Sequence, residues 1–178
     1  MGEGVEEETF LIDSATDLQG YLESNVLFWP LRAHSQPLTP ANLLLAERKL
    51  SHNDLPVHHS LQNAFARIDH VRRTMRGAWQ KKEVLEFSAR RNQFSTIIAD
   101  LTAGDGTGVD YRVIARLRTL LQLLCEDAID CRASQNSLDE LDFKLRSCLV
   151  PGEFIWSKEF ETVFPKSQFW FLYAHLHV

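Results

Sequence analysis

Cysteine is scarce in this chain, and the three that occur form no metal-binding or redox motif. Cys125, Cys131 and Cys148 are odd in number, and no two of them have the CxxC spacing. On a helix, Cys125 and Cys131 would point in different directions, because six residues turn through about 600°. These features favour reduced cysteines in an intracellular, cytoplasmic protein.

Long hydrophobic runs and targeting signals are also lacking. No apolar stretch approaches the roughly 20 residues that a membrane-spanning helix needs. The first residues, MGEGVEEETF, are acidic where a secretory signal would be basic and then apolar. We therefore expect no membrane association, and we expect residues 1–12 to be an acidic, flexible N-terminus.

Signatures of catalysis and of metal binding are missing as well. The sequence contains neither the nucleophile motif GxSxG nor the zinc motif HExxH. Three histidines lie within SHNDLPVHH, residues 51–59, but His58 and His59 would diverge by about 100° in the first turn of a helix. We therefore predict no catalytic residue, no metal site and no cofactor.

Positive charge is absent from residues 1–25, which hold seven acidic residues and no Lys or Arg. Residues 57–118 carry eleven basic and six acidic residues, although the whole chain has a net charge of −5. Phosphate contacts supply most non-specific affinity for nucleic acid. Nucleic-acid binding by a basic helix over residues 67–91 is therefore one alternative function, and a solvated helix face neutralised by i,i+4 ion pairs is the simpler interpretation.

Apolar residues at helical spacing are abundant and predict an all-α protein. Capping patterns mark helix starts at Ser14, Thr39, Thr107 and Ser137, and Thr39 precedes a proline at the first helical position. The helix after Thr107 has the clearest apolar stripe, made of Val109, Val113, Leu117, Leu120, Leu121, Leu124 and Ala128. The helix after Ser137 has its own stripe, made of Leu138, Leu141, Leu145 and Leu149.

The longest helical pattern begins near Pro56 and contains two apolar stripes. The first stripe is made of Val57, Leu61, Phe65, Ile68, Met75 and Trp79. The second is rotated by about a fifth of a turn and is made of Phe87, Phe94, Ile97, Ile98 and Leu101. Residues 80–86 separate the stripes, so either one long helix bends there or two helices meet.

Two segments lack helical periodicity, residues 25–31 and the aromatic-rich residues 151–178. We expect the second to be a C-terminal arm, in which residues 167–178 form either a strand or a helix. The whole chain, 1–178, is predicted to be a single all-α domain. Its expected architecture is an antiparallel bundle of four or five helices, with one long helix, straight or kinked, and short extended segments near the termini.

Two arginines fall within apolar stripes, which makes them the most distinctive polar residues. Arg72 lies between positions of the first stripe, and Arg90 recurs at the same angular position five turns later. A buried guanidinium needs a carboxylate or a bound anion, because an unpaired buried charge costs several kcal/mol. Asp110, Asp127 and Asp142 are the candidate carboxylates. A structural ion pair is one interpretation, and an enzyme or small-anion-binding cleft around Arg72 is the other.

The candidate binding residues combine this basic region with the aromatic arm. They are Arg72, Arg76, Arg90, Arg91, Trp170 and Tyr173. Aromatic side chains and arginine are enriched in the cores of protein interfaces. We therefore expect a non-enzymatic binding or scaffold protein that acts through a protein partner or through self-association, including a homodimer formed by the C-terminal arm.

Overall fold

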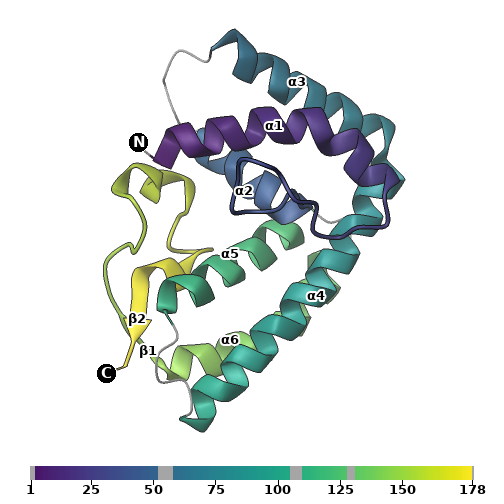
Figure 1. Cartoon of the computed structure of the whole chain (residues 1–178). Coiled ribbons are helices and arrows are strands. Elements are labelled where there is room, and N and C mark those ends of the chain that lie inside the picture. Colours follow the sequence, from purple (N-terminus) through teal and green to yellow (C-terminus); the bar gives the residue numbers. More distant parts are fainter. Residues whose placement is uncertain (1–2, 52–57, 105–109, 128–130, 178) are drawn as a thin grey trace. The chain divides into compact units, whose positions relative to one another are not determined.

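The computed structural model describes residues 3–51, 58–104, 110–127 and 131–177, which Figure 1 draws in colour. Most of these residues are helical, and the only sheet among them has two short strands. The predicted all-α class is therefore confirmed. No helix in the described part of the chain is long and apolar enough to cross a membrane.

The chain divides into two compact units, residues 1–86 and 87–178. The expectation of a single domain stays a prediction. Unit 1 contains the helices α1 (Glu3–Glu23), α2 (Pro40–Leu50) and α3 (His59–Thr74), and α1 contacts both of the others (Figure 1). Its core includes Leu11, Leu18, Tyr21, Leu38, Leu43, Ile68 and Trp79.

Helix α1 begins eleven residues before the predicted start at Ser14. Residues 3–12, expected to be flexible, are therefore helical. Phe10 and Leu11 are buried in the core of unit 1, and their burial favours a helix that starts upstream of them. Ser14 is itself buried within the helix, where its hydroxyl has no hydrogen-bond partner among the described residues, so the capping pattern is not used as a cap.

The predicted start of α2 is confirmed. The Thr39 hydroxyl accepts a hydrogen bond from the backbone N–H of Asn42 at 3.2 Å, and Pro40 occupies the first helical position. Before this cap, Trp29 and Leu38 form an isolated antiparallel bridge with backbone bonds of 3.2 and 2.8 Å. The non-helical segment predicted at residues 25–31 is therefore present.

The long helical pattern is divided at Met75, not at residues 80–86. Helix α3 ends at Thr74 and α4 spans Arg76–Ala103, so residues 80–86 lie within an uninterrupted helix. Met75 has φ −114° and ψ 33°, outside the helical region, although its carbonyl accepts a hydrogen bond from the N–H of Trp79 at 3.0 Å. The apolar stripe rotates near residue 86 because α4 passes there from unit 1 into unit 2.

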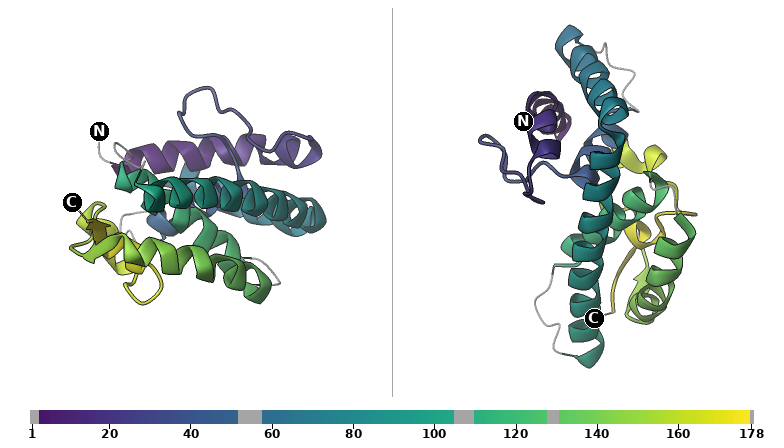
Figure 2. Two further views of the ribbon diagram at one scale, coloured as in Figure 1. Left: turned by 90° about the horizontal axis from the view of Figure 1, so that it is seen from below. Right: turned by 90° about the vertical axis from the view of Figure 1, so that its right-hand side faces the viewer.

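Unit 2 contains the rest of α4, the helices α5 (Tyr111–Asp127) and α6 (Cys131–Ser147), and the C-terminal segment. In this segment, β1 (Leu149–Pro151) pairs antiparallel with β2 (Ala174–Leu176), which follows a 3₁₀ helix at Trp170–Tyr173. The views in Figure 2 show the segment (yellow) against α5 and α6 (green), which it contacts. Residues 170–176 therefore form a helical turn followed by a strand.

The predicted start of α6 at Ser137 is wrong, because the helix begins at Cys131. Inside the helix, the Ser137 hydroxyl donates a hydrogen bond to the carbonyl of Ser134 at 2.7 Å, a bond that Ser also makes away from helix ends. For α5, the predicted cap Thr107 lies outside the described residues. Val113 of the predicted α5 stripe is exposed, whereas four leucines of that stripe are buried, namely Leu117, Leu120, Leu121 and Leu124.

Candidate functional site

The structure separates the predicted binding residues between the two units. Arg72 and Arg76 lie in unit 1, whereas the other four lie in unit 2. The Arg72 guanidinium donates a hydrogen bond to the Glu47 carboxylate at 2.8 Å and lies 4.4 Å from the centre of the Trp79 ring. The predicted need for a carboxylate is met, but by Glu47 rather than by any of the three aspartates. Arg76 is exposed on the first turn of α4.

The remaining basic candidates and Tyr173 contribute to the packing of unit 2. Arg90 is buried, and the Arg91 Nε donates a hydrogen bond to the carbonyl of Ser137 at 3.3 Å. The Tyr173 hydroxyl donates to the carbonyl of Phe164 at 2.9 Å. Burial raises the pKa of Tyr173, and the nearby Glu161 carboxylate raises it further.

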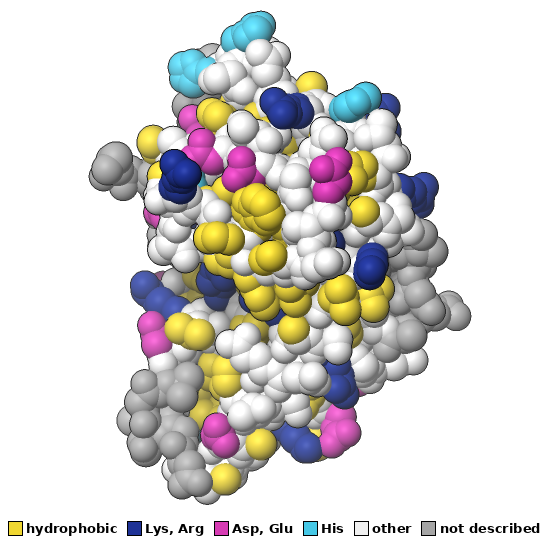
Figure 3. All heavy atoms as spheres, turned by 45° about the vertical axis from the view of Figure 1, so that its right-hand side comes forward, with side chains coloured by type: hydrophobic (Ala, Val, Ile, Leu, Met, Phe, Trp, Pro, Cys, Tyr) yellow, Lys and Arg dark blue, Asp and Glu magenta, His cyan; other side chains and the backbone are white. Residues whose placement is uncertain are grey.

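Part of the basic stripe predicted over residues 67–91 is turned inward. Lys82 is buried, donates hydrogen bonds to the carbonyls of Ser24 and Val26, and lies 4.4 Å from the centre of the Tyr21 ring. Desolvation lowers the pKa of Lys82, and the charge of Lys81 lowers it further. On the face drawn in Figure 3, basic side chains (dark blue) are interspersed with acidic ones (magenta).

Two of the three histidines of residues 51–59 lie where α3 begins. His58 is the N-cap residue and His59 the first residue of the helix, whereas His52 lies outside the described residues. Among the residues that the structure describes, no three His, Cys, Asp or Glu side chains form a group that could hold a metal ion.

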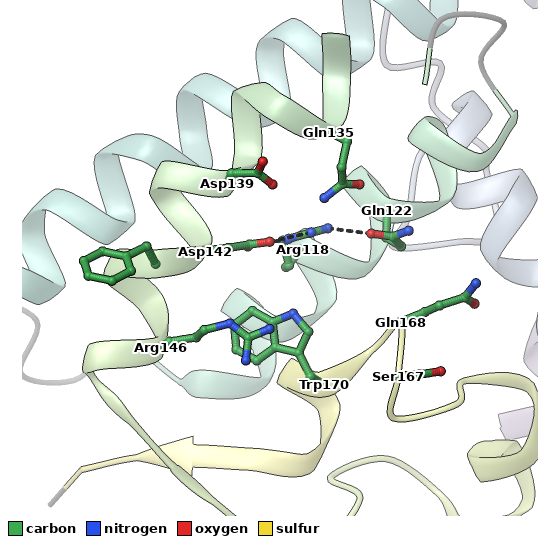
Figure 4. A pocket seen from close by; sticks show the side chains of 10 residues that line it. Arg118, Gln122, Gln135, Asp139, Asp142, Arg146, Ser167, Gln168 and Trp170 are labelled. Atoms are coloured by element: carbon green, nitrogen blue, oxygen red, sulfur yellow. Dashed lines mark hydrogen bonds and ion pairs between the residues drawn. The ribbon is translucent and has the colours of Figure 1, made fainter. Parts of the chain in front are cut away.

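A pocket of about 510 Å³ lies in unit 2, which is within the usual size range of ligand sites. Its walls come from α5, α6 and the loop before the 3₁₀ helix at Trp170–Tyr173 (Figure 4). The lining residues are Arg118, Gln122, Gln135, Asp139, Asp142, Phe143, Arg146, Ser167, Gln168 and Trp170. Trp170 is therefore the one predicted binding residue that lines this pocket.

The innermost part of the pocket is a buried ion pair between α5 and α6. Arg118 donates two hydrogen bonds of 2.7 Å to the two carboxylate oxygens of Asp142, which is a bidentate arrangement. A third bond of 3.2 Å runs from Arg118 to the side-chain oxygen of Gln122, and the Phe171 ring lies 5.1 Å from the guanidinium. These contacts hold the guanidinium in place, so the pair is a fixed and neutral base for the pocket.

Helix α6 supplies a polar stripe on the pocket side. Gln135, Asp139, Asp142 and Arg146 follow one another at spacings of four, three and four residues, which places them on one face of a helix. Figure 4 shows Gln135 and Asp139 pointing into the space beside the Arg118–Asp142 pair. The stripe lies next to the buried positions Leu138, Leu141 and Leu145.

The outer wall of the pocket is formed by Arg146 and Trp170. The Arg146 guanidinium lies 3.5 Å from the centre of the Trp170 ring, and Figure 4 shows the two groups stacked. Arginine stacked on an aromatic face loses little of its hydrogen-bonding capacity, because its N–H groups point outward in the plane of the fork. The stack therefore presents a positioned cation at the mouth of the pocket.

Arg118 is absent from the predicted binding residues, although its sequence neighbours indicate that it is buried. It has the apolar residues Ile114, Leu121 and Cys125 at positions −4, +3 and +7, so its side chain had to enter the core. Arg118 is 1% exposed, so it is more deeply buried than Arg72. Asp142, one of the three candidate carboxylates, pairs with Arg118 and not with Arg72.

Comparisons with known proteins identify no relative of this chain. No protein family, no curated protein and no solved structure matches it. The chemistry of the pocket is therefore derived from its own residues, which offer charges, side-chain amides and aromatic faces.

Proposed function

We propose that this chain is a non-enzymatic binding protein that recognises another polypeptide through the α6 face of unit 2. This face comprises the pocket side of α6 together with Trp170. In this proposal, the other helices act as a scaffold, packed as the antiparallel bundle of four or five helices that the sequence predicts.

The observation that carries the proposal is the exposure of Phe143 in the pocket wall. Phe143 is 76% exposed, more than any other large hydrophobic residue among those described. Water contact with a phenylalanine ring is unfavourable, and burying one stabilises a complex by about 1.5–3 kcal/mol. The stacked Arg146 and Trp170 line the same pocket, and Trp and Arg are the residue types that most often dominate binding energy.

The support beneath this face is rigid. The bidentate Arg118–Asp142 pair joins α6 to α5, and the Tyr111 hydroxyl joins α5 to the carbonyl of Phe171 at 2.6 Å. A preorganised surface loses less conformational entropy when it binds. The binding groups are thus held by contacts that do not depend on a partner.

Selection from a phage-displayed peptide library on the immobilised full chain tests the proposal. We expect enriched peptides that bind the unsubstituted chain and bind a Phe143→Asp variant at least tenfold more weakly, since a carboxylate replaces the apolar anchor. The matched control is Val113→Asp on α5, which is also an exposed apolar residue but lies outside the pocket lining. Failure to enrich any peptide, or equal binding by the Phe143→Asp and Val113→Asp variants, would contradict the proposal.

A second copy of the chain is the alternative partner. Size-exclusion chromatography with light scattering measures self-association directly. If the partner is a second copy on this face, the full chain elutes as a dimer, Phe143→Asp elutes as a monomer and Val113→Asp stays dimeric. A dimer that survives the Phe143→Asp substitution would place self-association on another surface, such as the predicted C-terminal arm.

A further inference from the structure

The charges that line the pocket define the kind of segment it fits. Two of them, Arg118 and Asp142, neutralise each other in the buried ion pair. The other two, Asp139 and Arg146, have opposite signs and are exposed. Within the described residues, Asp139 has no cationic partner and Arg146 has no carboxylate partner. The four formal charges cancel, so the pocket does not favour a strongly anionic ligand such as a nucleic acid.

The separation of the two unpaired charges follows from their positions on α6. Asp139 and Arg146 are seven residues apart, so they lie on the same face of the helix, about 10 Å apart along its axis. A complementary ligand carries one cation and one carboxylate at about this distance. In an extended peptide of the polyproline II type, with three residues per turn and about 3.1 Å per residue, side chains three residues apart lie on the same side at about this distance.

A free side-chain amide favours an extended segment over a helical one. The Gln135 amide points into the pocket and has no hydrogen-bond partner within the described part of the chain (Figure 4). A glutamine amide can both donate and accept, which matches the free N–H and C=O of an extended peptide. A helical ligand has already satisfied its own backbone groups, so it would leave this amide unpaired.

We propose that the pocket binds an extended peptide segment that carries one acidic and one basic side chain about three residues apart. The acidic side chain pairs with Arg146 beside Trp170, the basic side chain pairs with Asp139, and the backbone between them bonds to Gln135. This inference rests on the proposed function, because it specifies the chemistry of the partner at the same α6 face.

Two pooled peptide libraries of equal length and composition test this chemistry. One library fixes Glu-Xaa-Xaa-Lys and the other Lys-Xaa-Xaa-Glu, with uncharged residues elsewhere, and binding to the full chain is measured by fluorescence anisotropy at low salt. We expect the chain to prefer one library by about fivefold or more, because, for a peptide bound in one chain direction, the wrong order places like charges together at both positions. The double variant D139K/R146E exchanges the two charges and should prefer the other library by a similar factor.

Two controls show whether a changed library preference comes from the pocket charges themselves. Asp139 and Arg146 are exposed, so the exchange should leave the fold intact, as an unchanged far-ultraviolet circular dichroism spectrum would show. Arg112→Glu, a charge reversal on α5 outside the pocket lining, should keep the original preference. Reversal of the preference only in D139K/R146E supports the inference.

The outcomes also separate this inference from the proposed function. Binding of both libraries with equal affinity, weakened by Phe143→Asp, would overturn the charge assignment and leave peptide binding at the α6 face standing. An unchanged preference in D139K/R146E would likewise overturn the assignment. Binding of neither library, together with no enrichment from the random library, would overturn both proposals.

Discussion

Truncation of Asp142 is the sharpest test of how the α6 face is held in place. Asp142→Ala removes both 2.7 Å hydrogen bonds of the Arg118 guanidinium and leaves a positive charge that is 1% exposed. Removing one partner of a buried ion pair typically costs about 3–5 kcal/mol. The carboxylate of Asp142 is partly accessible and the bond to Gln122 remains, so we expect the lower end of this range, about 3 kcal/mol.

Urea unfolding, followed by circular dichroism at a helix-sensitive wavelength, measures this loss. For a chain of this length, the loss corresponds to a fall in the melting temperature of about 6–12 °C. The control is Asp139→Ala, which removes an exposed carboxylate from the same helix and should change the free energy of unfolding by less than about 0.5 kcal/mol.

A double variant distinguishes an unpaired charge from lost packing. Replacing Arg118 with Met and Asp142 with Leu removes both charges together, and such exchanges are often close to neutral. We therefore expect the double variant to be more stable than Asp142→Ala alone. A loss below about 1 kcal/mol for Asp142→Ala would refute the reasoning, because it would mean that Arg118 is not held in a desolvated site.

Three further predictions concern other contacts. Thr39→Ala should lower the free energy of unfolding by about 1 kcal/mol in denaturant titrations, because it removes the side-chain cap of α2, whereas Thr39→Ser should largely retain it. Tyr111→Phe should lower the free energy of unfolding by about 1 kcal/mol, because it removes the 2.6 Å hydrogen bond to the carbonyl of Phe171. A near-neutral effect would contradict that hydrogen bond. Burial raises the pKa of Tyr111 above that of an ordinary tyrosine, so the folded state binds the proton more tightly than the unfolded state. The stabilisation that the protonated Tyr111 hydroxyl contributes is therefore fully present below about pH 10 and is lost as the pH rises further. Tyr111→Phe should reduce this loss of stability at alkaline pH in melting experiments.

Helix identity was predictable from local periodicity, but two of the predicted helix starts, at Ser14 and Ser137, are wrong. Thr39 followed by Pro40 specifies a helix start by itself, since a proline in a later turn would break the helix. Ser14 and Ser137 begin capping patterns without a proline, each followed three residues later by an acidic residue, yet both lie inside helices. Whether such a serine caps a helix depends on whether upstream residues, such as Phe10, are buried by tertiary contacts.

The site was less predictable than the fold because it depends on pairing between elements. Periodicity showed that a buried arginine must have a partner, which holds for Arg72. It could not show that the partner is Glu47, since that residue lies on a different helix, 25 positions earlier. The pocket is lined by residues of α5, α6 and the segment 167–170. No local sequence pattern indicates that these three segments lie side by side.

Hydrogen exchange of the full chain, with and without a selected peptide, tests the central claim most directly. If the α6 face binds the peptide, backbone amides in residues 135–146 and 167–172 should exchange more slowly in the complex, and those of α3 should not change. Slower exchange confined to α3, or a bound peptide that protects neither of the two unit 2 segments, would contradict the claim.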